Sequence, residues 1–368
     1  MIVLKATQEQ ILASLQSVAG IVERRHTLPI LANVMLRKTG DDVQLTTSDL
    51  EIQIRTQASL GGDSGNFSTT VGARKLMDIL RSMPSDQTVT LESNQNKLLL
   101  KSGKSRFSLQ TLPAEDFPLV QESTNFGPAF SVPQKTLKAL LQQVSFSMAV
   151  HDIRYYLNGI LFVAEGIQLS LVATDGHRLA YTSATLESEV PKQEVILPRK
   201  TVLELLRLLS DKEGDIHMQF ASNQARFSFD GKEFVTKLVE GKFPDYNRVI
   251  PKSHKNSITL GKSALLVCLQ RIAILTTDKF KGVRINLEPG VLRVAASNAE
   301  QEEAIDEIEV DYAGDSIEIG FNVTYLIDVL VNMNEDMVRM DLADSNSSVL
   351  VTIPENAFFK YVVMPMRI

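Results

Sequence analysis

The segment DGHR at 175–178 holds the residue types in this chain that most resemble an acid–base site. It sets the carboxylate of Asp175 two residues before the imidazole of His177, and such a pair could move a proton. Asp49 and Asn298 occupy the same place in two similar phrases, SDL and SNA, and neither phrase holds a histidine. An Asp or Asn that hydrogen-bonds its own backbone where a strand ends explains all three copies. We therefore predict three structural turns and no catalytic residue.

Other signatures of catalysis or metal binding are missing from the sequence. It contains neither a G-x-x-x-x-G-K-[ST] phosphate loop nor a G-x-G-x-x-G fingerprint. No two histidines stand at metal-ligand spacing; the five are His26, His151, His177, His217 and His254. The single cysteine, Cys268, excludes an internal disulfide and a Cys-rich zinc site. We expect a protein without enzymatic activity, cofactor or metal.

Basic residues on predicted helices suggest a different chemistry, the binding of phosphates. A protein that holds DNA without recognising its sequence needs Lys and Arg at the phosphates and little else. Arg74 and Arg81 are seven residues apart and so share a helix face. An ordinary solvated helix face explains such residues equally well. Ten cations fall on predicted helices: Arg74, Lys75, Arg81, Lys135, Lys138, Arg199, Lys200, Arg207, Lys262 and Arg271.

Two further stretches carry cations outside these helices. ERRH at 23–26 includes Arg24 and Arg25. RYY at 154–156 sets a cation beside two aromatic rings, as nucleic-acid contacts often do. The start of a strand with one buried tyrosine would give the same pattern.

The elements that position these residues recur three times along the chain, which predicts a triplicated α+β protein. Each copy opens with an amphipathic helix; in the first copy Ile11, Leu15 and Val18 form the apolar stripe. A strand pair ending in the turn phrase follows, then a second helix, then alternating strand-like runs. The second helices are predicted at 74–83, 199–209 and 322–333, and the closing runs at 105–112, 225–239 and 358–366. We expect domains at 1–125, 126–252 and 253–368.

Composition fits a globular protein of several domains. Of the 368 residues, 44% are hydrophobic and 22% charged, and no apolar run reaches the length of a membrane span. The N-terminus lacks the apolar core of a signal peptide, so we expect a cytoplasmic protein that does not contact membranes. The net charge of −6 is uneven: 13 basic minus 13 acidic residues give 0 in the first third, 15 minus 14 give +1, and 10 minus 17 give −7. A solubilising acidic surface would also explain this distribution.

Several phrases resemble the β subunit family of bacterial DNA polymerase III, the sliding clamps. They include HTLPILANVML at 26–36, IRYYLNGILF at 153–162, ATDGHRLA at 173–180 and YVVMPMRI at 361–368. The resemblance implies three clamp domains per chain, each with two helices packed on antiparallel sheets. It also implies a head-to-tail homodimer that forms a six-domain ring around duplex DNA without recognising its sequence. A non-catalytic peptide-binding scaffold of the same fold, without DNA encirclement, is the alternative.

The resemblance also implies partners and binding residues. The partners are the polymerase III catalytic subunit, the clamp loader, and other polymerases and repair proteins that carry clamp-binding motifs. The expected DNA-binding residues are Arg24, Arg74, Arg81, Arg154, Tyr155, Tyr156, Arg199 and Lys200. The expected peptide pocket, away from Arg154 and the helix cations, comprises Leu157, Thr174, Gly176, His177, Arg178, Leu179, Pro244, Arg248, Val249, Val363, Met364, Pro365 and Met366.

The dimer interface is expected to join unlike ends of two chains. A basic and apolar edge late in the first domain comprises Lys104, Arg106, Phe107 and Leu109. Its acidic and apolar counterpart in the third domain comprises Ile274, Leu275, Glu300, Glu302 and Glu303. Contacts between unlike surfaces close a ring when the rotation between subunits permits.

Overall fold

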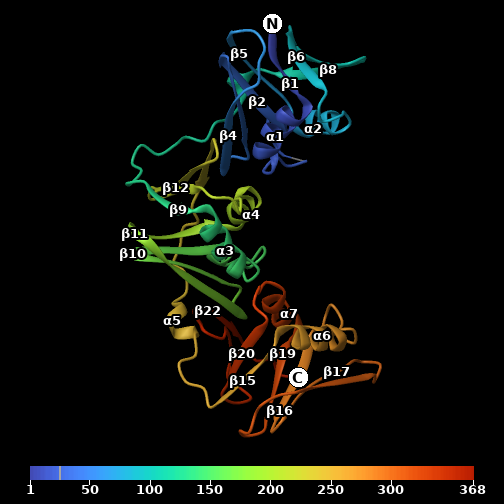
Figure 1. Cartoon of the computed structure of the whole chain (residues 1–368), viewed down its shortest axis with the longest axis vertical. Helices are drawn as coiled ribbons and strands as arrows, with labels where there is room; N and C mark the ends of the chain where they lie inside the picture. The colour runs from blue at the N-terminus through green and yellow to red at the C-terminus, as the bar shows by residue number, and fades with distance from the viewer. Residues whose placement is uncertain (25) are drawn as a thin grey trace. The chain divides into compact units, whose positions relative to one another are not determined.

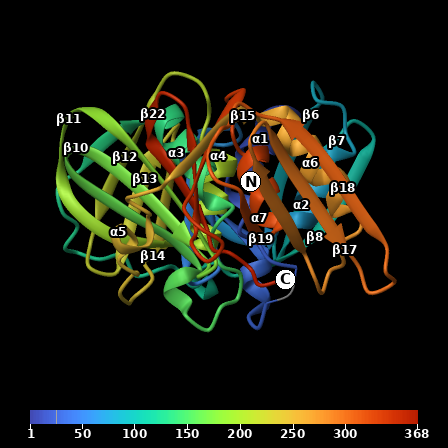
Figure 2. The same cartoon turned by 90° about the horizontal axis from the view of Figure 1, so that it is seen from below.

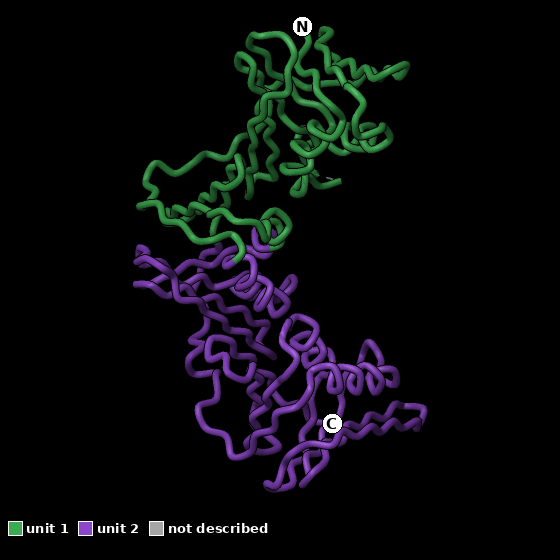
Figure 3. The backbone as a smooth tube through the Cα atoms, viewed as in Figure 1, with its two compact units in different colours: residues 1–135, 203–238 green, residues 136–202, 239–368 purple. Residues whose placement is uncertain are grey.

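The computed structural model describes residues 1–24 and 26–368, so Arg25 of the ERRH stretch lies outside the described residues. The described chain divides into two compact units, residues 1–135 with 203–238 and residues 136–202 with 239–368 (Figure 3). Helices α3 (Gln134–Ser145) and α4 (Arg199–Leu208) each begin in one unit and end in the other. No described helix is both long enough and apolar enough to cross a membrane.

The first unit is built on one antiparallel sheet of twelve strands. Helices α1 (Gln8–Ala19) and α2 (Ala73–Arg81) pack against each other, and α1 packs on β3 and β4. The sheet order is β1 (Ile2–Thr7), β6 (Thr88–Asn94), β7 (Lys97–Ser102), β8 (Ser105–Leu112), β5 (Gly65–Gly72), β2 (Asn33–Gly40), β3 (Asp42–Ser48), β4 (Ile52–Ser59), β14 (Lys232–Lys237), β13 (Gln224–Phe229), β12 (Asp215–Phe220) and β9 (Phe130–Pro133).

The sequence of α1 explains both its start and its packing. Thr7 caps the helix: its hydroxyl accepts from the Gln10 amide at 3.3 Å, and the Gln10 side chain accepts from the Thr7 amide at 3.2 Å. This reciprocal capping box satisfies amides that lack a partner at a helix start. Ile11, Leu15 and Val18 are buried, as their spacing predicts.

The second unit contains two antiparallel sheets (Figure 1). Helices α6 (Lys262–Ala273) and α7 (Val323–Val331) pack against each other, and α6 also lies on β17 and β18 (Figure 2). The six-stranded sheet runs β10 (Gly159–Thr174), β11 (Arg178–Pro198), β22 (Asn356–Val363), β21 (Val349–Ile353), β20 (Met337–Leu342) and β15 (Asn256–Gly261). The four-stranded sheet runs β18 (Glu303–Glu309), β17 (Val291–Ser297), β16 (Gly282–Glu288) and β19 (Ile317–Asn322).

The three predicted turns are confirmed. The Asp49 carboxylate accepts from the amides of residues 51 and 52 at 2.9 and 2.7 Å. The Asp175 carboxylate accepts from the amides of residues 177 and 178 at 2.9 and 3.1 Å. The Asn298 side-chain oxygen accepts from the amides of residues 300 and 302 at 3.1 and 2.9 Å. The acid–base appearance of DGHR is thus explained by a backbone turn.

Two strand pairings join different copies of the repeat. β4 of the first copy pairs with β14 of the second, with Ile54 opposite Phe234. β11 of the second copy pairs with β22 of the third, with Leu179 opposite Val362. These pairings protect strand edges that would otherwise be open. The sequence pattern predicts the strands but does not predict that sheets continue from one copy into the next.

Candidate functional site

A pocket of about 160 Å³ lies in the second unit, where four segments distant in sequence meet. They are the turn between β10 and β11, the 3-10 helix η3 (Tyr155–Leu157), the segment leading into the short helix α5 (Tyr246–Val249), and the end of β22. Leu157, Leu179 and Val362 are each about 1% exposed, whereas Met364 and Val249 are 49% and 43% exposed. The pocket therefore has a buried apolar floor and an accessible apolar rim, as expected of a site for a small apolar ligand segment.

The β10–β11 turn is held rigidly at the pocket wall. The Thr174 hydroxyl donates to the Arg178 carbonyl at 2.6 Å and accepts from the Gly176 amide at 3.1 Å. Gly176 has a φ of +91°, and a Cβ there would lie 3.0 Å from the Arg154 guanidinium. Both the left-handed backbone and the close approach of Arg154 therefore favour glycine at this position. The Met364 amide donates to the His177 carbonyl at 3.0 Å, so β22 is fastened to the same turn.

Arg154 lies at this pocket, so the expectation that it lies elsewhere is wrong. Its guanidinium pairs with Asp152 at 2.9 Å and donates to the Asp175 carbonyl at 3.4 Å. Hydrogen bonds from Arg154 lower the pKa of the Asp152 carboxyl to about 2. Near neutral pH the Arg154 charge is therefore balanced by Asp152, which weakens its attraction for a phosphate.

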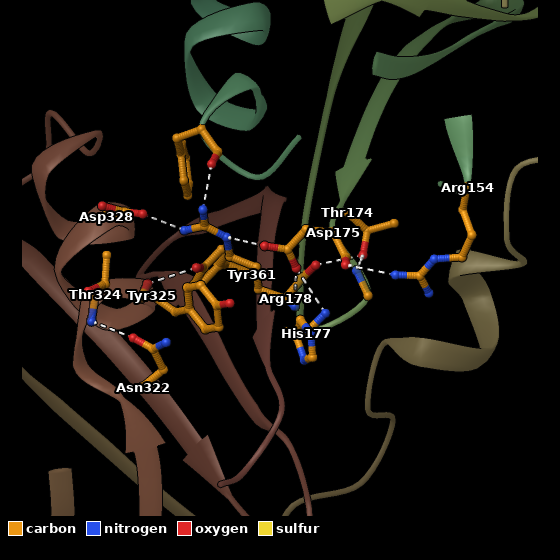
Figure 4. Close-up of polar contacts among 12 residues, drawn as sticks. Arg154, Thr174, Asp175, His177, Arg178, Asn322, Thr324, Tyr325, Asp328 and Tyr361 are labelled. Atoms are coloured by element: carbon orange, nitrogen blue, oxygen red, sulfur yellow. Dashed lines mark hydrogen bonds and ion pairs between the residues drawn. The ribbon is translucent and has the colours of Figure 1, made fainter. Parts of the chain in front are cut away.

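Arg178 lines the pocket, but its guanidinium is engaged within the protein (Figure 4). It donates to Asp175 at 3.2 Å, to Asp328 at 2.5 Å and to the Phe146 carbonyl at 2.8 Å. The side chain is only 10% exposed and stacks over the Tyr325 ring, with 4.5 Å from the guanidinium carbon to the ring centroid. Arg178 thus forms part of the wall and is not available as a cation for a ligand.

The structure brings together nine of the thirteen residues predicted for the pocket. These are Leu157, Thr174, Gly176, His177, Arg178, Leu179, Pro244, Val249 and Met364. The other four lie outside its wall. Arg248 lines an adjacent open hollow, and Val363 is fully buried in the sheet. Pro365 and Met366 do not line the pocket, and the Met366 amide bonds to the Gly320 carbonyl.

Three lining residues are not among those that the sequence predicts for the pocket: Arg154, Tyr156 and Val362. Val362 could have been predicted as a pocket residue from the sequence, because alternate residues of a strand share a face and Val362 is two residues before Met364. The same rule puts Val363 on the opposite face. Tyr156 is partly buried against the apolar core below the pocket, whereas Tyr155 is 58% exposed. The alternative prediction, that RYY at 154–156 begins a strand, is wrong, because Tyr155 and Tyr156 lie in a 3-10 helix.

The predicted phosphate-binding cations lie on helices as expected, and several have partners. Arg74 and Arg81 are exposed on α2; Arg74 donates to the Val22 carbonyl at 2.7 Å, which brings it close to the segment of Arg24. Arg199 is half-buried, and this burial lowers its pKa. Lys200 follows it at the start of α4.

The residues predicted for the two interface edges lie at a hairpin, at a helix end and at a turn. Lys104, Arg106 and Phe107 lie at the β7–β8 hairpin, with both cations exposed. Leu109 is only 6% exposed within its own unit, so it is not a free apolar contact as predicted. Ile274, at the end of α6, is 77% exposed and Leu275 is partly buried. Glu300, Glu302 and Glu303 are exposed around the turn into β18.

Known proteins match this chain along nearly its whole length. Residues 2–121, 131–245 and 247–367 match the N-terminal, central and C-terminal domains of the DNA polymerase III beta subunit. The beta sliding clamps of Pseudomonas aeruginosa and Escherichia coli K12 are 45% and 42% identical, with 98% of each chain covered. A crystallised sliding clamp of Pseudomonas aeruginosa bound to griselimycin is 44% identical over 99% of both chains, with a TM-score of 0.95.

These matches cover all three copies of the repeat seen in the sequence. The chain belongs to the DNA polymerase III beta subunit family and contains its three clamp domains. Members of this family are non-catalytic processivity factors. Among the residues that the structure describes, no group of three His, Cys, Asp or Glu side chains could hold a metal ion.

Proposed function

We propose that the chain is a DNA sliding clamp that encircles duplex DNA as a head-to-tail homodimer. Through the pocket at Leu179 and Met364 it would tether the DNA polymerase III catalytic subunit, other polymerases and repair proteins, and it would be opened by a clamp loader. The domains would divide near residues 125 and 252, and the protein would act in the cytoplasm. Its full-length relationship to named beta sliding clamps is the observation that carries this proposal.

The strand pairings support ring closure by a second copy. β4, β11 and β18 each follow one of the three turns, while β14, β22 and β8 are the last strands of their copies. Within the chain β4 pairs with β14 and β11 with β22. In the described chain β18 has β17 as its sole neighbour, and residues 105–110 of β8 pair with β7 alone. Pairing of β18 with β8 of another copy would complete the pattern.

The charges of the two open edges favour this pairing. The hairpin at β8 carries Lys104 and Arg106, both exposed. The turn into β18 carries Glu300 and Glu303, also exposed. Opposite charges on the two edges would steer unlike ends together, whereas like ends would repel.

Retention on circular DNA tests encirclement directly. The dimer is diluted until it dissociates, mixed with a closed circular plasmid or with the same plasmid linearised, and reconcentrated. We expect the protein to coelute with the circle through gel filtration in high salt and to be released when a restriction enzyme cuts the circle. Equal retention on both forms, or on neither, would contradict encirclement. A monomer that binds peptide would favour the alternative of a scaffold without DNA.

Direct binding to DNA should depend on cations and not on base sequence. We expect Arg24→Ala combined with Lys200→Ala to flatten the plot of log affinity against log salt by up to about 0.9 for each phosphate that the variant no longer binds. Fluorescence anisotropy with two unrelated duplexes measures this slope. Arg154 is left out of the variant because it lines the pocket.

A control for total charge is Lys97→Ala combined with Lys279→Ala, since both of these lysines are exposed. This control should leave the slope unchanged. New selectivity between the two duplexes, or unchanged binding of the first variant at every salt concentration, would contradict the proposal.

A further inference from the structure

Arg178 joins three elements behind the pocket (Figure 4). Its guanidinium reaches Asp175 of the pocket turn, Asp328 on α7, and the carbonyl of Phe146 just beyond α3. α3 belongs to the segment matched by the central clamp domain and α7 to that matched by the C-terminal clamp domain. One nearly buried side chain therefore links the pocket wall to both domains. Charge-assisted hydrogen bonds of this kind are stronger than neutral ones.

Aromatic contacts fix the same junction. The Tyr325 ring lies under the Arg178 guanidinium and stacks with the His177 ring, with the two ring centroids 6.4 Å apart and the planes 18° apart. The buried Tyr361 donates its hydroxyl to the Tyr325 carbonyl at 2.7 Å. α7 is thereby fastened both to the turn and to β22. A shift of α7 would move His177, whose carbonyl holds the Met364 amide.

We propose that Arg178 and Asp328 form a latch that positions the pocket wall and couples peptide binding to the link that Arg178 makes between α7 and Phe146. In this latch both are positioning residues, and Asp328 is not among the residues lining the pocket. A peptide against His177 and Met364 stabilises the latched arrangement, and by thermodynamic reciprocity the latch increases peptide affinity. The inference rests on the proposed peptide-binding function.

The decisive variant is Asp328→Asn, which keeps the shape of the side chain and removes its charge. The probe is a fluorescent synthetic peptide carrying the clamp-binding motif of a DNA polymerase, and its Kd is measured by anisotropy. We expect the Kd to rise about tenfold, within the usual range of coupling between sites. Hydrogen exchange gives the second readout: saturating peptide should slow exchange at residues 144–148 and 323–332 of the unchanged protein, and much less in the variant.

Two further variants separate the latch from general destabilisation. Glu233→Gln removes the charge from a comparable pair with Arg55, and the Glu233 side chain is 30% exposed against 31% for Asp328. It should leave the peptide Kd unchanged. Asp328→Glu retains the charge and should restore part of the affinity and the exchange protection, which also provides a test if Asp328→Asn does not fold.

The outcomes distinguish the latch from the proposed function. If the unchanged protein binds no peptide, the proposed function fails. If it binds and Met364→Ala weakens binding, the function stands. A Kd for Asp328→Asn within twofold of the unchanged protein, an equal reduction in affinity in Glu233→Gln, or unaltered exchange protection would then overturn the latch alone.

Discussion

Replacing Met364 with alanine is expected to weaken binding of a polymerase-motif peptide by about thirtyfold, which corresponds to about 2 kcal/mol. Met364 and Val249 are the exposed apolar residues of the pocket rim, and truncating Met364 removes apolar area beside the buried Leu157 and Leu179. The backbone amide that bonds to His177 stays in place, so the turn should keep its conformation. Anisotropy titration with the labelled peptide measures the change, and gel filtration checks that self-association is unaltered.

A methionine of similar exposure provides the control. Met337 on β20 is 44% exposed and does not line the pocket. Met337→Ala should leave the peptide Kd within about twofold, because exposed substitutions away from a site cost little. If both variants bind the peptide as tightly as the unchanged protein, the pocket has been assigned to the wrong place.

Deleting residues 364–368 is a poorer test of the pocket than Met364→Ala. The Met366 amide bonds to the Gly320 carbonyl at 2.7 Å, and the Ile368 side chain approaches so closely that a Cβ on Gly320 would meet it at 2.7 Å. The deletion would therefore disturb β19 as well as the pocket. Failure of that variant to bind peptide would not distinguish a missing pocket wall from a damaged sheet.

The elements predictable from the sequence are those set by local patterns. The stripe of Ile11, Leu15 and Val18 needs only the period of a helix to identify it. The turns at Asp49, Asp175 and Asn298 depend on hydrogen bonds within a few residues of each side chain, so they too could be predicted. The threefold order of helices and strands follows from these local signals.

The parts that depend on distant pairing could not be predicted. The choice of β14 as the neighbour of β4 depends on which strand edges meet in space. The position of Arg154 beside Gly176 depends on the fold of two separate segments. Resemblance to a family, taken phrase by phrase, puts Val363 in the pocket, whereas the pleat of β22 turns Val362 toward it.

Reversing charge at the β18 edge is expected to have the largest effect on assembly. Glu300→Lys combined with Glu303→Lys would set two new cations against Lys104 and Arg106 of the other copy in the proposed pairing. Like charges placed together at an interface cost several kcal/mol. Each 1.4 kcal/mol is a factor of ten, so we expect the dimer Kd to rise about a hundredfold. Analytical ultracentrifugation over a dilution series measures the Kd.

Restoring the attraction tests whether these two edges are partners. Adding Lys104→Glu and Arg106→Glu to the same chain returns opposite charges to the two edges and should recover most of the dimer. Asp336→Lys with Glu355→Lys makes the same total change of charge at exposed residues elsewhere and should leave the dimer intact. Recovery in the fourfold variant, with no effect in this control, requires the β8 and β18 edges to meet. If the first reversal leaves the dimer Kd unchanged, the interface lies on other surfaces. The open strand edges would then not support ring closure.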